Sequence, residues 1–407
     1  MKSRNKSELL SPAGDYEKAT IALDYGADAI FLGAKAYSLR SQASNFFMKD
    51  IKKTCDYAHK KQKKVYAAVN VICHNSLLKG FPKFIKSLYE TGVDALIVAD
   101  PFIVDYVSKE YPNWELHLST QQSITNSAAA KFWKNNNISR IVLAREVSIK
   151  ELKQIVDNLK NEIELEYFIH GAVCISYSGR CMMSNNWSLR DANVGGCAQS
   201  CRWKFDLTDD KNTTKYTSEF TMSPKDMALV NQIKDLLDLN ISSFKIEGRM
   251  KSLNYVATVT KAYRQIIDFY KKNKKYELDK KILKDAKNDL KYAENRPCGT
   301  ALSKGMPTKN DMLYHNEERA LKQQFTFIVE KQLKNWIEVN SRNLFKVGQT
   351  FTIFGPTNKY SKLKLLEILD KNKQAIKIAN KPMEKYYLRF NNKSPLKINK
   401  HFIGRLD

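Results

Sequence analysis

Four of the seven cysteines in this 407-residue chain lie in one short segment. Their spacing is Cys174-x6-Cys181-x15-Cys197-x3-Cys201. Thiolates that converge from one segment can hold a soft metal centre, and a cubane iron–sulfur cluster accepts four of them from varied spacings. The segment therefore predicts a metal–thiolate centre, which would serve redox chemistry or organise an active site.

Zinc is the alternative occupant, because it also accepts four cysteines. Zinc sites usually draw them from pairs of Cys-x2-Cys, whereas the short pair here is Cys197-x3-Cys201. The residues alone leave iron–sulfur, zinc and unligated thiols open. Cys298 could replace one ligand, while we expect Cys55 and Cys73 to be packing residues in a helix and at a strand end.

An acidic and an imidazole side chain stand just before the cysteines. Glu166 and His170 lie four residues apart on a predicted strand, so we expect both to point to the same side. A carboxylate on an otherwise apolar strand would be costly to bury without a partner. With Glu247 on a later strand end, they are candidates for catalytic residues that orient substrate or transfer a proton. The alternative is a structural role, in which these side chains are buried in the core and paired with other polar groups.

Basic side chains at strand ends form a second group. Arg145 ends the sixth predicted strand, and Lys245 and Arg249 lie at the end of the eighth. Cations there could bind phosphate or a small carboxylated molecule, which arginine does with a two-pronged fork. Structural ion pairs between loops are the alternative. His117 and Glu8 are further substrate-binding candidates, and we expect Glu8 to pair with one of these cations.

Short apolar runs alternate with amphipathic stretches through the first part of the chain. Strands that alternate with helices indicate a parallel sheet, and eight such units predict an α/β fold with a closed, TIM-like (β/α)8 barrel over residues 1–296. An open doubly wound sheet is the alternative, but no Gly-x-Gly-x-x-Gly follows an early strand. The runs are Glu8–Pro12, Ala29–Gly33, Val65–Val71, Ala95–Ala99, Glu115–Ser119, Ile138–Ala144, Glu162–Ile169 and Ser243–Glu247.

The stretch between the seventh and eighth runs is far longer than one helix requires. We assign residues 171–226 to an insertion that contains the four clustered cysteines. A hairpin is predicted around Trp203–Leu207 and Lys215–Thr221, followed by a helix near Met227–Leu237. Long loops after barrel strands lie on the catalytic face, so the insertion is placed where function would be.

The pattern changes after the barrel. Residues 297–322 are predicted to be a linker, because Arg296-Pro-Cys298-Gly at the boundary and Gly305-Met-Pro307 look like irregular chain. Residues 323–407 carry alternating β-branched and aromatic runs separated by turn signals, which predict a small all-β barrel. These runs are Phe325–Val329, Trp336–Val339, Thr350–Phe354, Leu363–Leu369, Ala375–Ile378 and Tyr386–Phe390.

The formal net charge of +25 invites a polyanionic partner, because phosphates attract lysine and arginine at long range. Scattered lysines can also reflect coding bias, so charge alone does not establish nucleic-acid binding. Trp203 with its basic neighbours forms a patch that suits stacking on a splayed base, and an ordinary half-buried tryptophan is equally compatible. No apolar run is long enough for a membrane span and no export signal is recognised, so we expect a cytoplasmic protein without membrane contact. The oligomeric state is not predicted.

The run from Glu166 to Ser184, EYFIHGAVCISYSGRCMMS, resembles the signature of the collagenase-like peptidase family U-32. The resemblance spans almost the whole chain. Within the family, the C-terminal region and Gly196-Cys-Ala-Gln-Ser-Cys-Arg-Trp203 are most similar to the tRNA-hydroxylating branch. Further motifs fall in the family's order: Glu8-Leu-Leu-Ser-Pro-Ala-Gly14, Asp28-Ala-Ile-Phe-Leu-Gly33, Ser119-Thr-Gln-Gln122, Leu143-Ala-Arg-Glu146, Ser223-Pro-Lys-Asp-Met227 and Lys245-Ile-Glu-Gly-Arg249.

The resemblance implies an iron–sulfur-dependent enzyme that hydroxylates the wobble uridine of tRNA to 5-hydroxyuridine. It implies a [4Fe–4S] cluster on the cysteine quartet, tRNA as partner and a prephenate-derived co-substrate in oxygen-independent chemistry. A collagenase-like peptidase is the first alternative. The sequence offers it only a Cys174–His170 dyad, because His-Glu-x-x-His and Gly-x-Ser-x-Gly are absent. A non-catalytic RNA-binding scaffold is the second alternative.

Overall fold

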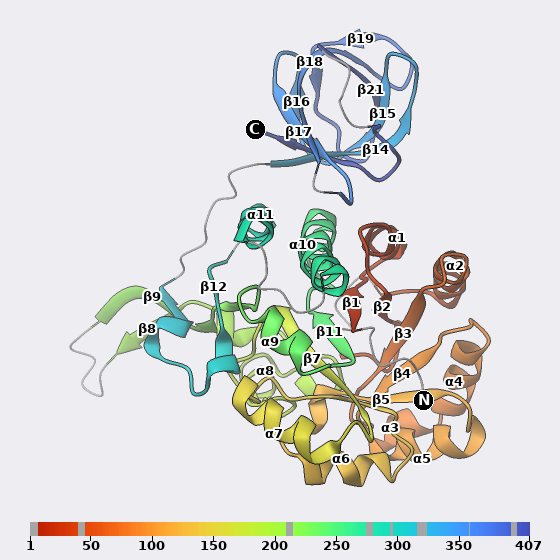
Figure 1. The fold of residues 1–407 in the computed structure, drawn as a ribbon, viewed down its shortest axis with the longest axis vertical. Helices are drawn as coiled ribbons and strands as arrows, with labels where there is room; N and C mark the ends of the chain where they lie inside the picture. Colours follow the sequence, from red (N-terminus) through yellow and green to blue (C-terminus); the bar gives the residue numbers. More distant parts are fainter. Residues whose placement is uncertain are drawn as a thin grey trace.

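The computed structural model describes residues 7–39, 45–208, 215–273, 280–293, 296–315, 324–357, 359–391 and 397–407. Figure 1 shows two barrels, a larger one in which strands alternate with helices and a smaller one of strands. The smaller barrel lies beyond the outer helices of the larger one, and a strand-rich excursion extends to one side.

Eight strands of the described chain form a closed parallel barrel. Neighbouring strands pair in chain order, and the last strand closes the circle by pairing with both the first and the seventh. The predicted TIM-like (β/α)8 barrel is therefore confirmed. The strands are β1 (Glu8–Pro12), β2 (Ala29–Gly33), β3 (Lys64–Val69), β4 (Ala95–Val98), β5 (Glu115–Leu118), β6 (Arg140–Val142), β7 (Glu164–Gly171) and β11 (Ser243–Ile246).

Helices cover the outside of this barrel. The Asp15 side chain caps the first helix by accepting from the backbone N–H of Lys18, and Ser148 with Glu151 forms a capping box on another. Their apolar faces pack with the strands in one continuous core. The helices are α1 (Tyr16–Asp24), α2 (Met48–His59), α3 (Asn75–Leu78), α4 (Phe81–Tyr89), α5 (Pro101–Glu110), α6 (Ser127–Lys134), α7 (Ile149–Leu159), α9 (Ile233–Asp238), α10 (Leu253–Lys272) and α11 (Lys280–Leu290).

The chain between β7 and α9 forms the cysteine-rich insertion. Its helical turns are short, and its two longer strands pair as the predicted hairpin. Two later strands join it: β12 (Cys298–Gly299) pairs with β10, and β13 (Met312–His315) pairs with β9. The described part of the expected linker thus adds strands to the insertion. The insertion's own elements are α8 (Met183–Ser188), η2 (Ala192–Val194), η3 (Ser200–Arg202), β8 (Phe205–Thr208), β9 (Lys215–Pro224) and β10 (Asp226–Ala228).

The helix predicted over Met227–Leu237 is wrong in its first half. β10 takes the first two residues of that range and pairs antiparallel with the end of β7, with Met227 opposite Gly171. The helix α9 begins only at Ile233. Backbone hydrogen bonds to an existing strand decide the conformation here, because tertiary context overrides a local helical pattern.

Six strands of the described C-terminal residues form a closed antiparallel barrel, as predicted. The strand Thr350–Phe354 pairs with a neighbouring strand on each side, which closes the circle. Buried phenylalanines and branched residues fill the interior. The last strand was not predicted. In order around the barrel they are β14 (Gln324–Gln332), β15 (Ile337–Ser341), β21 (Lys385–Phe390), β18 (Tyr360–Leu369), β17 (Thr350–Phe354) and β22 (Ile403–Leu406).

The two barrels meet through an apolar cluster and a buried polar network. Tyr25 and Ala257, from α1 and α10, pack with Phe354 and other residues of the smaller barrel. Arg405 of β22 is fully buried there and donates to the Asn254 side chain of α10 at 2.9 Å. The smaller barrel therefore rests on the helical outside of the larger one (Figure 1).

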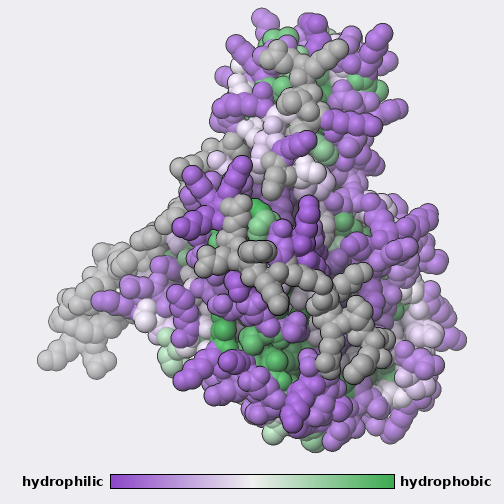
Figure 2. Space-filling view, in the orientation of Figure 1, coloured by the Kyte–Doolittle hydropathy of each residue, from purple (hydrophilic) through white to green (hydrophobic). Residues whose placement is uncertain are grey.

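Hydrophilic side chains cover most of the face drawn in Figure 2. Within the described residues, we find no helix with both the length and the apolar character that a membrane crossing would need.

Candidate functional site

The cysteine-rich insertion lies across the ends of the barrel strands. Glu146, just after β6, accepts hydrogen bonds from the backbone N–H of Ser178 at 2.9 Å and from its hydroxyl at 2.7 Å. The backbone N–H of Ile72, just after β3, donates to the carbonyl of Asn193 at 3.1 Å. These contacts hold the insertion over the carboxyl ends of the strands, which we call the mouth. In this fold the mouth is the catalytic end.

The four clustered cysteines come together within the insertion. Cys174 is exposed and the other three are half-buried, and no disulfide forms among the described residues. Burial raises the pKa of the Cys201 thiol, Arg202 opposes this, and the thiols of Cys174, Cys197 and Cys181 raise it further. The other three thiols therefore each lie within electrostatic range of Cys201.

The four thiols lie in one insertion, but in this structure they do not surround a common point. Among the described residues, no group of three or more Cys, His, Asp or Glu side chains is arranged to hold a metal ion. The donor set nevertheless fits a soft metal centre, because it consists of four free thiols from one insertion. A bound centre would have to draw the sulfur atoms together.

Arg145 and Glu247 form an accessible pair at the mouth. Nη2 of Arg145 lies 3.3 Å from Oε2 of Glu247, and the two side chains are 11% and 16% exposed. The Arg145 guanidinium also lies over the ring of Phe168, 4.0 Å from its centroid. Stacking on Phe168 and the ion pair with Glu247 hold the Arg145 guanidinium in place, so that its outer edge can bind an anionic ligand. The Glu247 carboxylate beside it can accept a proton.

Arg249 reaches the opposite wall of the mouth. Its Nη1 donates to the Ser38 hydroxyl, after β2, at 3.0 Å. The side chain passes over Gly33, where a Cβ would lie only 1.9 Å from Nη1. Glycine is required at Gly33 for this approach. Arg249 is buried, so in this structure it braces the β1–β2 side rather than meeting solvent.

Three predicted site residues lie deeper, in a charge cluster inside the barrel. Glu8, Arg140, Glu166 and Lys245 form this group, which we call the floor cluster. Lys245 Nζ lies 2.6 Å from Glu166 Oε1, and Arg140 Nη1 lies 2.7 Å from Glu8 Oε1 and 3.4 Å from Glu166 Oε2. Burial would raise the pKa of Glu166, but Lys245 and Arg140 outweigh it and lower that pKa.

Within the floor cluster two carboxylates face two cations, and Arg140 also pairs with Glu164 at 2.8 Å. Glu8 and Arg140 are the first residues of β1 and β6, so the cluster lies toward the amino ends of the strands. In TIM-like barrels this end serves stability. The structure places Lys245 inside the barrel together with Glu166 and Glu8, and a role of these residues at the catalytic site stays a prediction.

His117 also belongs to the barrel interior. Its ring is fully buried, 4.7 Å from the ring of Tyr66 in an edge contact. Tyr66 in turn donates its hydroxyl proton to Glu8 at 2.6 Å. Burial lowers the pKa of His117, so the imidazole is neutral near pH 7. The structure places His117 beside the floor cluster and away from the cysteines.

His170 does not point to the same side as Glu166. The β7–β11 register shifts after Lys245, so that His170 lies opposite Ile246. Such a bulge reverses the alternation of side chains along a strand. The His170 ring packs against Tyr255 and Tyr263 of α10, with Nδ1 3.3 Å from the Tyr263 hydroxyl. Burial, with a smaller contribution from Lys251, lowers its pKa to about 3.

Trp203 follows the last clustered cysteine and is 41% exposed. It shares this exposure with Tyr177 and Trp187 of the same insertion. Exposed aromatic rings near a mouth can stack on unpaired bases. Trp203 is exposed, and its role in stacking on a base stays a prediction.

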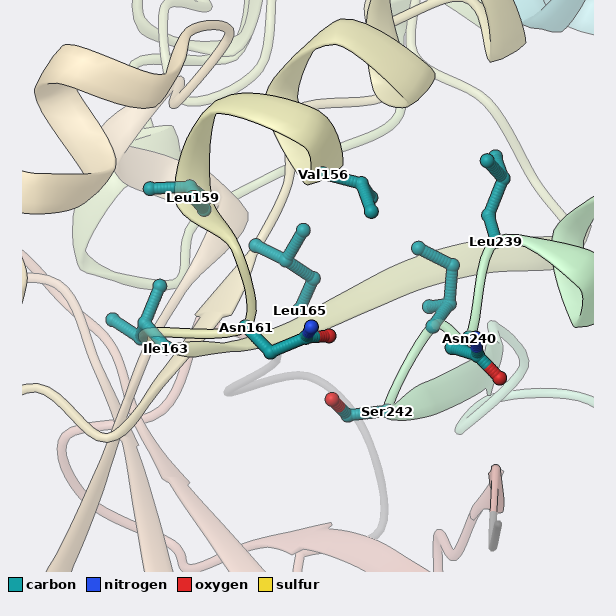
Figure 3. Close-up of a pocket in the computed structure, with 9 residues that line it drawn as sticks. Val156, Leu159, Asn161, Ile163, Leu165, Leu239, Asn240 and Ser242 are labelled. Atoms are coloured by element: carbon teal, nitrogen blue, oxygen red, sulfur yellow. The ribbon is translucent and has the colours of Figure 1, made fainter. Parts of the chain in front are cut away.

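A small, partly open hollow, with about 20 Å³ of space for the centre of a water molecule, lies at the other end of the barrel (Figure 3). Leu159 and Ile163 line it together with Asn161 and Asn240 from two turns. It opens near the start of β7, away from the cysteines and from Arg145. We assign it no function.

Sequence reasoning missed Arg140, Tyr66 and the tethering role of Glu146. Arg140 interrupts the apolar run Ile138–Ala144, and a lone cation within such a run requires a buried acid. That signal could have identified Arg140 as the partner of Glu8 and Glu166. Tyr66 carries no such signal, because a tyrosine in a strand is ordinary.

Fold and site together define a class: barrel proteins of the TIM type whose mouth is covered by a cysteine-rich insertion and which carry a second, all-β barrel. The model of peptidase family U32 matches residues 14–313, and that of the peptidase family U32 C-terminal domain matches residues 322–400. The chain belongs to peptidase family U32.

Three relatives show the range of names in this family. The chain is 39% identical over 387 residues to tRNA hydroxylation protein P1 of Bacillus subtilis, covering 93% of this chain and 90% of the relative. It is 33% identical over 309 residues to tRNA hydroxylation protein P of Escherichia coli, covering 65% and 68%. It is 30% identical over 278 residues to a collagenase of Porphyromonas gingivalis, covering 65% and 66%.

Proposed function

We propose that this protein is a tRNA-modifying enzyme that hydroxylates the wobble uridine to 5-hydroxyuridine. The observation that carries this is the 39% identity, over nearly the whole chain, to a protein named for tRNA hydroxylation. Both barrels fall within that alignment's coverage. The cysteine quartet over the mouth and the net charge of +25 agree with a redox centre and a polyanionic substrate.

Cys174, Cys181, Cys197 and Cys201 would hold a [4Fe–4S] cluster. Such a cluster, when bound, supplies one-electron chemistry next to the substrate. Zinc remains the alternative, because it also accepts four thiolates. The insertion's contribution is to bring the thiols to the mouth, through contacts such as that between Glu146 and Ser178.

The side chains of the mouth would position the substrates. A base in the anticodon loop must leave its stack before its ring atoms can enter a barrel mouth. Trp203 would stack on an unpaired base, and Arg145 would bind the carboxylate of a prephenate-derived co-substrate. Glu247, held by Arg145, would accept a proton from the bound substrate.

The peptidase alternative rests on the family's collagenase-named relative. Its nucleophile would be Cys174 with His170 as base. The His170 ring lies against the tyrosines of α10 and its pKa is about 3, so it is a poor base at neutral pH. An RNA-binding scaffold is the other alternative, and it would leave tRNA chemistry unchanged.

The function is tested by nucleoside mass spectrometry of tRNA from cells with and without this gene. We expect 5-hydroxyuridine-type nucleosides to disappear in the deletion strain and to return with the wild-type gene. Unchanged nucleosides in the deletion strain would rule out the hydroxylase. A scaffold that only binds tRNA predicts that unchanged result.

The cofactor is tested by single cysteine replacements. Cys181→Ser should lower iron and sulfide per chain in anaerobically purified protein and abolish hydroxylation, because the quartet loses a ligand. Cys55→Ser is the matched control: Cys55 is buried in α2, far from the insertion in the fold, and should leave the iron content unchanged. A colourless, zinc-loaded wild-type protein would contradict the iron–sulfur assignment.

A further inference from the structure

The cysteine-rich insertion contains the same short motif twice. Tyr177-Ser-Gly-Arg180 and Trp187-Ser-Leu-Arg190 each place an aromatic ring three residues before an arginine. In both motifs the residue before the arginine has a left-handed backbone, with φ at +72° in Gly179 and +52° in Leu189. The first motif is a turn, and the second spans the end of α8. The chain thus presents the same pair of side-chain types at two places in the insertion.

Both motifs expose the ring and the arginine. Tyr177, Trp187 and the third ring of the insertion, Trp203, are each between 41% and 48% exposed. Arg180 and Arg190 are exposed as well. Large apolar side chains that gather on one exposed segment mark an interaction surface, because their apolar area would otherwise be buried. The insertion therefore offers aromatic rings and cations together.

The two motifs are anchored at different points around the mouth. Ser178, within the first motif, donates to Glu146, which follows β6. Asp191, directly after the second motif, lies 3.3 Å from Nε2 of His74, which follows β3. Three strand positions separate β3 from β6, about 14 Å along the barrel wall at the usual strand spacing. This separation of the anchors favours an extended ligand over a single base.

Trp187 and Trp203 belong to one side of the insertion. The Trp187 ring packs against the Phe205 ring, with the centroids 4.9 Å apart. Trp203 has an extended backbone and stands two residues before Phe205, and extended chain turns side chains two residues apart to the same side. Asp206, the next residue of β8, turns to the opposite side. The ring side of this strand therefore does not carry the carboxylate of Asp206.

We propose that Tyr177, Trp187 and Trp203 form a stacking surface for several unpaired nucleotides of an RNA loop, with Arg180 and Arg190 bound to their phosphates. The inference rests on the proposed function and extends it from one base to the nucleotides that flank it. Aromatic rings stack on the bases of single-stranded RNA with little regard to base identity.

Charge favours RNA over an apolar protein partner. Between Ala172 and Asp206 the chain holds four basic and two acidic residues, and one of the acids, Asp191, is paired with His74. The whole chain has a formal net charge of +25. Such a surface attracts a polyanion at long range, and its rings then stack on the bases of that polyanion.

The rings are tested by binding of a fluorescently labelled anticodon stem-loop RNA to anaerobically purified full-length protein. Tyr177→Ala and Trp187→Ala should each raise the dissociation constant at least about fivefold, because each removes a stacked base. Trp187→Phe keeps a ring against Phe205 and should restore most of the affinity. Phe132→Ala, at an exposed ring of α6 outside the insertion, is the matched control and should bind as the wild type does.

Two outcomes of this experiment would overturn the stacking surface. One is equal affinity of the wild type and both alanine variants, which would assign the exposed rings to a partner other than RNA. The other is binding by Trp187→Phe as weak as that by Trp187→Ala, because loss of affinity would then not follow the loss of a ring.

The arginines are tested by the salt dependence of the same binding. Each phosphate contact to a single strand contributes about 0.7 to the slope of log affinity against log salt concentration. Arg180→Gln and Arg190→Gln should therefore each reduce that slope by about 0.7. Lys109→Met, at an exposed lysine of α5, is the control and should leave the slope unchanged. Wild-type slopes in both arginine variants would overturn the phosphate contacts.

Unlabelled competitors identify the part of the RNA that is bound. The loop alone, as a linear oligonucleotide, should displace the labelled stem-loop, whereas a blunt duplex with the sequence of the stem should not. A duplex that competes as well as the linear strand would overturn the proposal, because the stem and not the unpaired bases would then be recognised.

Binding requires no hydroxylation, so the surface and the proposed function can fail separately. If deletion of the gene leaves the tRNA nucleosides unchanged while the ring variants lose RNA affinity, the surface stands and the hydroxylase does not. If 5-hydroxyuridine disappears in the deletion strain while the ring variants bind RNA as the wild type does, the hydroxylase stands and the surface is wrong.

Discussion

The two ends of the (β/α)8 barrel use the same kinds of side chain for different purposes. At the floor, Glu166 and Glu8 face Lys245 and Arg140 in a buried cluster. At the mouth, Arg145 and Glu247 are partly open. The comparison shows that residue type does not distinguish a structural ion pair from a ligand site. The degree of burial does.

The largest effect on stability is expected from breaking the floor. Glu166→Gln leaves Lys245 with a neutral partner in the core and should lower the free energy of unfolding by about 3–5 kcal/mol, as loss of one partner of a buried ion pair does. Urea denaturation of the full chain measures it. Glu164→Gln is the control, because Glu164 also pairs with Arg140 but is 55% exposed. Glu164→Gln should lower the free energy of unfolding by about 1 kcal/mol or less. Equal costs for the two variants would contradict the distinction between floor and surface.

A smaller effect should appear in the pH dependence of stability. The folded-state pKa of His170, about 3, lies below its ordinary value of 6.5. The unfolded chain therefore binds a proton that the fold excludes, and stability present above pH 6.5 is lost as pH falls toward 3. His117, also buried with a lowered pKa, acts in the same direction.

His170→Asn should flatten the slope of unfolding free energy between pH 6 and 5 by about 1 kcal/mol per pH unit. Denaturation series across this range measure the slope. His59→Asn, at a partly exposed ring, is the control and should leave it nearly unchanged. A slope in His170→Asn that equals that of the wild type would show that His170 is not held neutral.

The smallest effect on stability is expected at the mouth. Arg145→Ala removes a partly open ion pair and should cost about 1 kcal/mol or less. If Arg145 positions a substrate, tRNA hydroxylation should nevertheless fall at least about tenfold. Nucleoside analysis of complemented deletion strains measures the activity, with Lys109→Met as the neutral control. If the Arg145→Ala variant loses stability but keeps full activity, Arg145 has a structural role. The mouth and the floor of the barrel would then not differ in the use of their ion pairs.

Much of the architecture could be predicted because it depends on local patterns. Short apolar runs mark all eight strands of the larger barrel. The cysteine spacing predicted that the thiols gather, because they belong to one insertion. Turn signals and β-branched runs predicted the smaller barrel.

The remaining features depend on how distant segments align. A single bulge between β7 and β11 turns His170 outward, and spacing along one strand cannot show it. The role of Glu166 depends on Lys245, 79 residues away, and on the register that brings them together. Asp226 was part of a recognised motif, yet its partners Lys251 and Arg296 come from other parts of the fold.

The path of the chain between the barrels has a practical consequence for anyone who wishes to divide the protein. β12 pairs with β10 and β13 pairs with β9, so they extend two different sheets that contain strands of the cysteine-rich insertion. A fragment that stops at residue 296 would expose the edges of β9 and β10 and invite aggregation. Expression of the first barrel alone should therefore extend at least through His315.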